Sequence, residues 1–153
     1  MSGAEARLAE LGLELPDVVA PVAAYVPTAV SGNLVWTSGQ LPFVSGSLPA
    51  TGKVGAAVDA DTAKTLARTC ALNALAAIRA EIGELSKVRR VVKVVGFVAS
   101  DPAFTGQPGV INGASELLGD VFGDAGRHAR SAVGVAVLPL DAPVEVEVVV
   151  EVA

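Results

Sequence analysis

Thiol and imidazole groups are scarce in this sequence, whose 153 residues include one cysteine, Cys70, and one histidine, His128. A single cysteine cannot form a disulfide within the chain, and these two side chains alone cannot supply the ligands of a zinc centre. Long apolar runs are missing as well, since no stretch approaches the roughly 18 to 20 residues that cross a bilayer. We therefore expect neither a metal site nor a membrane span.

Positive charge is also in short supply. The chain has 11 Lys and Arg residues against 16 Asp and Glu residues, which gives a net charge of -5 and a pI near 4.8. The field of such a protein repels phosphate backbones, so we do not expect nucleic acid as a partner. The segment Met1–Arg7 lacks the basic, apolar and cleavable parts of a secretory signal, which favours a cytoplasmic protein.

Apolar residues are abundant, at 52% of the chain with a mean hydropathy of +0.56. No low-complexity linker or internal repeat divides the sequence. We predict an amino-terminal extension, residues 1–24, with a short helix near Ala4–Leu13 and with Pro16 and Pro21 in extended chain. A single domain follows over residues 25–153. Excess apolar surface without a membrane segment points to an oligomer.

Hydrophobic periodicity predicts an α+β domain with the element order β-β-α-β-α-β-β. The expected elements, in chain order, are strands Tyr25–Val30 and Leu34–Thr37 joined at Gly32-Asn33, a loop Pro42–Gly55, a helix Asp61–Ile82 between an Asp59 N-cap and Gly83, a strand Val91–Val98, a helix Val110–Phe122, and a hairpin of Ser131–Leu138 with Val144–Glu151. We expect strand Val91–Val98 to be buried on both faces except at Lys93. Two helices cover one face of this mixed sheet, so the other face needs a partner.

The best functional clue is Arg130, which heads the otherwise apolar first strand of that hairpin. A guanidinium is permanently charged and its planar fork matches a carboxylate, so this placement suggests a carboxylate site. The alternative is a strand-end arginine that reaches to water or pairs with a surface acid. Both interpretations stay open on the sequence alone.

The geometry of the predicted hairpin bears on any site shared by Arg130 and Glu145. Direct pairing places Ala136 opposite Glu145 and Arg130 near Glu151, with Arg130 and Glu145 on one face of the sheet. Six residues then separate the two levels, roughly 20 Å at about 3.3 Å per residue. Either this register is wrong, or a site combines Arg130 of one subunit with Glu145 of another.

Several motifs together resemble the RidA (YjgF/L-PSP) family. They are Tyr25, the run Thr37–Pro42, Asn112, Arg130, Leu138-Pro139 and Val144–Glu147. The resemblance implies a chorismate-mutase-like fold and a homotrimer with three clefts between its subunits. It also implies hydrolysis of reactive 2-enamine and 2-imine intermediates of amino acids to 2-keto acids and ammonia, without a metal or organic cofactor. The amino-terminal extension and the loop Phe43–Val58 suggest a divergent branch.

The same resemblance implies roles for individual residues. Arg130 would bind the carboxylate of a small substrate, and Glu145 would position or activate the attacking water. The other residues expected at the substrate are Tyr25 from the neighbouring subunit, Ser38, Gly39 and Asn112. The stretch between Asn112 and Arg130 is one residue longer than in typical members. Ala132 stands where well-known members often have cysteine.

Three further side chains each have two interpretations. Cys70 lies in the apolar stripe of its helix, which favours a core residue over a reactive thiol. Trp36 fits a core or interface position better than a ligand-stacking one. His128 could act as an acid or base beside Arg130, although we favour a solvent-exposed turn.

Four other functions stand as alternatives. The strongest is a non-catalytic trimer that binds small carboxylates as a sensor. An endoribonuclease role is attached by name to part of the family, but the acidic pI and the few aromatic residues argue against RNA affinity. Chorismate mutase activity rests on fold alone, and a purely structural assembly module would make no use of Arg130.

Overall fold

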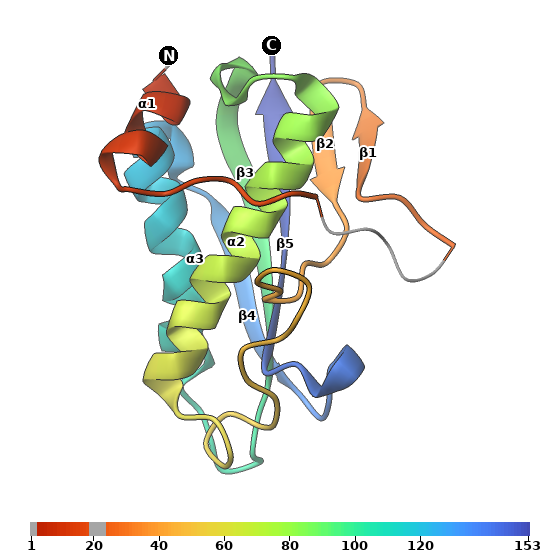
Figure 1. The fold of residues 1–153 in the computed structure, drawn as a ribbon, viewed down its shortest axis with the longest axis vertical. Coiled ribbons are helices and arrows are strands. Elements are labelled where there is room, and N and C mark those ends of the chain that lie inside the picture. The colour runs from red at the N-terminus through yellow and green to blue at the C-terminus, as the bar shows by residue number, and fades with distance from the viewer. Residues whose placement is uncertain (1–2, 19–23) are drawn as a thin grey trace.

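A five-stranded sheet organises the chain, with the helices gathered on one of its faces (Figure 1). The computed structural model describes residues 3–18 and 24–153. The strands are β1 (Thr28–Ser31), β2 (Leu34–Thr37), β3 (Val88–Ala99), β4 (Ala129–Val135) and β5 (Val144–Val152). The helices are α1 (Gly3–Glu10), α2 (Ala60–Ile82) and α3 (Gln107–Phe122), with short 3-10 turns η1 (Leu85–Lys87), η2 (Gly123–Gly126) and η3 (Pro139–Asp141). The predicted α+β class and element order are confirmed, with α1 preceding the sheet.

Local signals in the sequence set both ends of α2. A side-chain oxygen of Asp59, the N-cap, accepts a hydrogen bond from the Thr62 N–H at 2.7 Å, and this bond lowers the pKa of Asp59. Gly83 ends the helix at φ 91°, where its N–H donates to the Arg79 carbonyl. Cys70 in the apolar stripe is fully buried. The predicted caps of this helix and the core position of Cys70 are confirmed.

The first two strands form the predicted hairpin. Ser31 pairs with Leu34 across a two-residue turn, in which Gly32 adopts φ 60°. Strand β1 begins at Thr28, so Tyr25 lies in the segment that leads into it rather than in the strand. The sheet therefore starts later than the sequence pattern indicates, while the turn lies where it was expected.

The carboxyl-terminal strands differ from the predicted hairpin. The sheet order is β1-β2-β5-β3-β4, so β3 separates β4 from β5. The crossover through α3 places β4 parallel to β3, which leaves the opposite edge of β3 for antiparallel pairing with β5. The turn η3 connects β4 to β5, with Leu140 and Asp141 at φ 59° and 58°. The predicted pairing of Ala136 with Glu145, and of Arg130 near Glu151, is therefore wrong.

Alternation along β5 distinguishes the two faces of the sheet. Val144, Val146 and Val148 are fully buried on the face that the helices cover. Glu145 and Glu147, which alternate with them, point to the opposite face. The residues of β3 that pair with these positions share their faces, and the register of β3 with β4 extends the assignment to β4.

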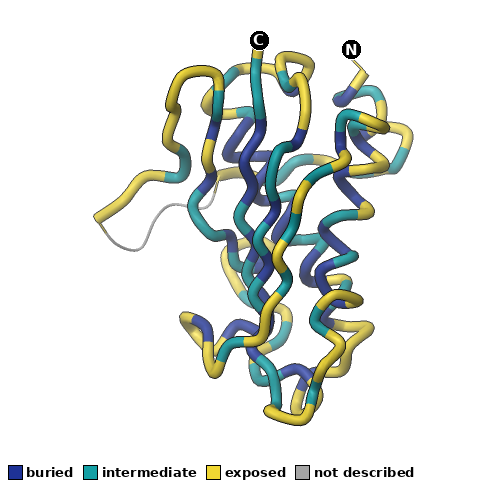
Figure 2. Tube along the Cα trace, turned by 180° about the vertical axis from the view of Figure 1, so that it is seen from behind, coloured by how far each residue is buried: buried dark blue, intermediate teal, exposed yellow. Residues whose placement is uncertain are grey.

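The face opposite the helices is uncovered in one chain, and part of it is apolar. Trp36 of β2 and Val133 of β4 are 49% and 44% exposed, and Figure 2 shows exposed and half-buried segments along this side. Val95 and Phe97 of β3 are only half-buried. The expectation that β3 is buried on both faces is thus wrong for a single chain, and Trp36 is not a core residue of it.

Helix α1 packs against α3. Leu8 is 4% exposed, and Arg7 Nε donates a hydrogen bond to the Asp120 carbonyl at 3.0 Å. The predicted short helix is thus present and joins the core of the domain. The expectation for Pro21 lies outside the described residues, and the division of the chain at residue 24 stays a prediction.

Two glycines of α3 provide a test of the packing between α2 and α3. A Cβ on Gly113 would overlap the backbone carbonyl of Lys64 in α2, whereas a Cβ on Gly119 meets no atom within 4 Å. We expect Gly113→Ala to destabilise the fold by about 1 to 3 kcal/mol through overpacking. Gly119→Ala should stabilise it by about 0.5 to 1 kcal/mol, because alanine has the higher helix propensity. Urea unfolding at matched protein concentration measures both changes, and shifts of the same sign would contradict this packing.

Candidate functional site

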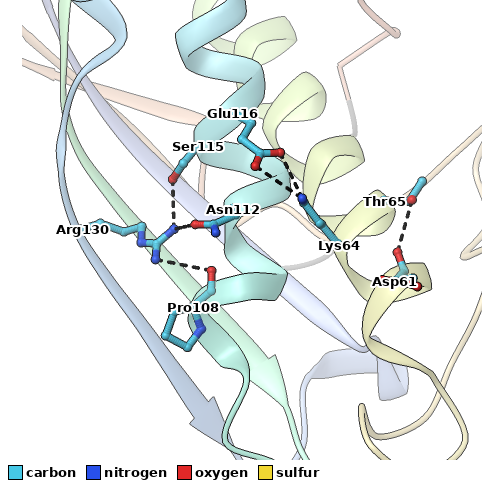
Figure 3. Close-up of polar contacts among 8 residues, drawn as sticks. All are labelled: Asp61, Lys64, Thr65, Pro108, Asn112, Ser115, Glu116 and Arg130. Atoms are coloured by element: carbon cyan, nitrogen blue, oxygen red, sulfur yellow. Dashed lines mark hydrogen bonds and ion pairs between the residues drawn. The ribbon is translucent and has the colours of Figure 1, made fainter.

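Arg130 projects from β4 toward α3, on the face of the sheet that the helices cover (Figure 3). Its Nη1 donates hydrogen bonds to Asn112 Oδ1 at 2.8 Å and to Ser115 Oγ at 3.2 Å. Its Nη2 donates a longer one to the Pro108 carbonyl at 3.4 Å. The first turns of α3 therefore hold the guanidinium from three directions.

This arrangement leaves one edge of the guanidinium available. Both N–H groups of Nη1 are in use, so a carboxylate that binds through two parallel hydrogen bonds would take the edge formed by Nε and Nη2. The ion pairs within residues 3–18 and 24–153 do not include Arg130. Of the two interpretations of Arg130, the structure thus does not support pairing with a surface acid in its own chain.

Glu145 lies on β5 and is held against Gly39. A Cβ at residue 39 would overlap the carboxyl group of Glu145, so only glycine leaves room for that side chain. Burial raises the pKa of Glu145, and the negative charge of Glu147 raises it further. A carboxylate with a raised pKa is a better proton acceptor near neutral pH than an ordinary one.

Ser38 ties the segment that carries Tyr25 to the same end of the sheet. Its hydroxyl donates to the Val26 carbonyl at 2.6 Å, and its N–H donates to the Pro27 carbonyl at 2.8 Å. Tyr25 itself is 49% exposed. Ser38, Gly39 and Glu145 thus form one group at the junction of β2 and β5, with Tyr25 on the segment bonded to it.

The two groups lie on opposite faces of one chain. Arg130 pairs with Val94 and Glu145 pairs with Phe97, on the two sides of β3. The two residues are offset by three residues along the strands, about 10 Å, and by two strand spacings across the sheet, also about 10 Å. The Cα atoms of Arg130 and Glu145 are therefore roughly 14 Å apart. The expectation that Arg130 and Glu145 share a face is wrong, because it depended on the hairpin register. The predicted hairpin also kept Arg130 and Glu145 apart within one chain, and the structure agrees with that separation.

Sequence reasoning missed the role of Ser115, which contacts both Arg130 and His128. His128 Nε2 lies 2.8 Å from Ser115 Oγ, and His128 Nδ1 lies 2.6 Å from the Gly126 carbonyl oxygen. The ring is half-buried, so the expectation of a solvent-exposed turn is wrong. The spacing of Asn112 and Ser115, three residues apart on one helix, was the available signal that both could meet a single partner.

Two other kinds of site find no counterpart in the described part of the chain. No three His, Cys, Asp or Glu side chains gather there into a possible metal site. No helix there has both the length and the apolar character to cross a bilayer.

Burial raises the pKa of the Cys70 thiol well above its usual value, so this thiol remains protonated at neutral pH.

Comparisons with known proteins cover nearly the whole chain. Residues 5–152 match the protein-family model described as "YjgF/chorismate_mutase-like, putative endoribonuclease". Protein TCP17 of Trypanosoma cruzi is 47% identical over 149 residues, which cover 95% of this chain and 92% of that protein.

Two solved structures are similar over nearly their full length. The Agrobacterium tumefaciens protein Atu1372, of unknown function, is 51% identical with a TM-score of 0.90, over 98% of this chain and 92% of that one. A Shewanella oneidensis protein is 34% identical with a TM-score of 0.96, over 99% of this chain and 100% of that one. The similarity therefore includes the segment that precedes β1.

The pKa of Glu145 leads to a prediction for pH-dependent stability. Folding raises the pKa of the Glu145 carboxyl group above its pKa in the unfolded chain. As the pH rises past the pKa of the unfolded chain, the unfolded chain loses this proton first, so the free energy of unfolding falls. We expect Glu145→Gln to stabilise the fold at pH 7, with the gain fading below about pH 4, where the wild-type side chain is protonated in both states.

Urea unfolding of both proteins between pH 3.5 and 8 provides this test. Glu147→Gln is the matched variant, since removal of its charge should lower the pKa of Glu145 and recover part of the same gain. A difference between Glu145→Gln and wild type that is the same at every pH would contradict the assigned cause.

Proposed function

This chain belongs to the YjgF/chorismate mutase-like family, and we propose that it hydrolyses reactive 2-enamine and 2-imine intermediates of amino acids to 2-keto acids and ammonia. The observation that carries the proposal is the guanidinium of Arg130, whose Nη1 is held by Asn112 and Ser115 while its Nε–Nη2 edge carries only the long hydrogen bond from Nη2 to the Pro108 carbonyl. That edge is suited to the carboxylate that all such intermediates share. Glu145 supplies the carboxylate with a raised pKa that the hydrolysis needs.

A structural relative supports the class of ligand. TdcF of Escherichia coli, 26% identical with a TM-score of 0.59, has been solved with bound serine. Serine carries a carboxylate next to a carbon that bears nitrogen, and a 2-imino acid has the same arrangement. This similarity supports a ligand of the same kind at the edge of Arg130.

The reaction makes modest demands on the protein. The imine carbon is already electrophilic, so the site has to hold the anion, orient a water molecule and move protons. Glu145 accepts a proton from the water as its oxygen bonds to the imine carbon. The proton then passes to the nitrogen, which gives a carbinolamine with a hydroxyl and an amino group on the same carbon. The hydroxyl proton moves to the amino nitrogen as the carbon–nitrogen bond breaks, so ammonia and a 2-keto acid leave. Arg130 holds the carboxylate throughout and gives the reacting carbon a fixed position.

A complete site in this scheme needs two chains. Arg130 and Glu145 lie on opposite faces of one sheet, with β3 between their strands. The face that carries Glu145 is uncovered and includes Trp36 and Val133, which are apolar and partly exposed. We therefore propose a homotrimer whose three clefts each combine Arg130 and Asn112 of one subunit with Glu145, Gly39, Ser38 and Tyr25 of the next.

Light scattering of the purified protein tests the assembly. The trimer predicts a mass of about 46 kDa, three times the 15.3 kDa of one chain. Trp36→Glu should shift the mass toward that of the monomer, because it places a charge in the covered interface. Dilution of wild type to nanomolar concentration without loss of the trimer would support an obligate assembly, whereas a wild-type monomer would contradict the two-chain site.

An imine-trapping assay tests the activity. Imines are generated from a panel of small, branched and aromatic amino acids by an amino-acid oxidase, and semicarbazide competes with hydrolysis for them. Wild type should accelerate release of the 2-keto acid, and Arg130→Ala should lower kcat/KM by about 100-fold through loss of the carboxylate partner. Glu145→Gln should lower kcat by about 100-fold, as expected for a missing general base.

Matched controls separate site effects from general ones. Arg127→Ala removes an exposed arginine three residues from Arg130, and Glu81→Gln removes an exposed carboxylate on α2; both should behave as wild type. Full activity in Arg130→Ala, or no acceleration by wild type across the panel, would overturn the proposed reaction.

A trimer that binds 2-keto or amino acids without turnover is the second candidate. The Nε–Nη2 edge of Arg130 favours it equally, since binding needs only that edge. Titration calorimetry with 2-oxobutanoate distinguishes the two. Binding that survives in Glu145→Gln, together with no measurable turnover in wild type, would identify a binding protein.

A further inference from the structure

A chain of hydrogen bonds leads from Nη1 of Arg130 through Ser115 to His128 and the Gly126 carbonyl. The Gly126 carbonyl can only accept, so His128 Nδ1, 2.6 Å away, is the donor and carries the proton. With the ring neutral, Nε2 then accepts from the Ser115 hydroxyl at 2.8 Å. The Ser115 oxygen in turn accepts from Arg130 Nη1 at 3.2 Å. Every donor in this chain thus points toward the Gly126 carbonyl, and the guanidinium of Arg130, which can only donate, stands at the opposite end.

We propose that His128 is a positioning residue that acts through Ser115 to orient Arg130 for carboxylate binding. This inference rests on the proposed function in one respect, that Arg130 is the group that binds the carboxylate. His128 touches Ser115 and the Gly126 carbonyl, and its role does not require contact with the substrate. It differs in this way from the acid or base role considered for it above.

The protein fixes both ends of the imidazole. Gly126 is buried at the end of η2, where a Cβ would overlap the Leu118 carbonyl of α3. The carbonyl that accepts the hydrogen bond from Nδ1 is therefore held against the same helix that carries Ser115. The histidine ring is placed between η2 and α3, and its orientation is set before any ligand arrives.

Loss of the imidazole would leave the Ser115 hydroxyl without its hydrogen-bond acceptor. A serine within a helix then turns to donate to the carbonyl four residues earlier, here that of Ile111, and its oxygen leaves the position that Arg130 uses. The guanidinium would keep Asn112 and lose its second Nη1 acceptor. A ligand would then have to order the guanidinium on binding, which weakens affinity without altering the chemical step.

The experiment measures the dissociation constant for 2-oxobutanoate by titration calorimetry and kcat and KM in the imine assay. His128→Ala and Ser115→Ala should each raise the dissociation constant and KM about fivefold, the effect of one lost hydrogen bond, with kcat within about twofold of wild type. His128→Gln presents an amide oxygen near the position of Nε2 and should restore most of the affinity. Arg127→Ala, in the same loop, should leave all three values unchanged.

The double variant tests whether the two residues act through one chain. His128→Ala combined with Ser115→Ala should bind no more weakly than Ser115→Ala alone, because the same connection is already broken. Full additivity of the two effects overturns the inference. Unchanged affinity in His128→Ala does so too, as does an equal loss of affinity in His128→Ala and His128→Gln. Light scattering and thermal melts check folding, and Ser115→Ala with His128→Gln carries the test if His128→Ala does not fold.

Failure of the inference and failure of the proposed reaction give different results. If the affinity for 2-oxobutanoate depends on His128 but wild type hydrolyses no imine, the inference is supported and the proposed reaction is overturned. If wild type hydrolyses imines and His128→Ala changes neither KM nor the affinity, only the inference is overturned. If wild type binds none of the 2-keto acids that correspond to the amino-acid panel, both are overturned.

Discussion

Strand β3 lies between the strands that carry Arg130 and Glu145, and this placement governs what one chain can do. The α3 crossover puts β4 beside β3, and β5 takes the other edge. Arg130 then faces the helices while Glu145 faces the uncovered side of the sheet. In the proposed reaction, each chain thus holds an anion-binding half and a proton-accepting half that do not meet. Assembly, in this account, is a requirement of the chemistry as well as of the exposed apolar face.

Each half is organised by contacts that exist before any ligand binds. Asn112 and Ser115 hold Nη1 of Arg130, with His128 behind Ser115, so that the Nε–Nη2 edge carries only a long hydrogen bond to the Pro108 carbonyl. The absence of a side chain at Gly39 gives the Glu145 carboxyl group its position, and burial together with Glu147 raises its pKa. Preorganised halves of this kind would limit what the substrate of the proposed reaction must order on binding, and the fold would then set the orientation of its reacting carbon.

Local signals predicted the parts of the fold that depend on neighbouring residues. The Asp59 cap, the Gly83 terminator and the Gly32 turn act within a few residues, and each was located correctly. The hairpin of β4 and β5 failed because a short connection between two apolar strands usually joins neighbours, whereas here β3, distant in sequence, lies between them. The partner of His128 was missed for the same reason, since Ser115 comes from another element. Arg130 was found because an isolated charge in an apolar strand is visible in the sequence itself.

The most direct test of the account is complementation between two inactive variants. Arg130→Ala keeps the proton-accepting half and Glu145→Gln keeps the anion-binding half, so equal co-expression should yield mixed trimers in which about one quarter of the clefts pair two intact halves. The account predicts imine hydrolysis near one quarter of the wild-type rate from two proteins that are each inactive alone. Mixed trimers with no activity above that of the parents would show that Arg130 and Glu145 do not meet across subunits, and would contradict it.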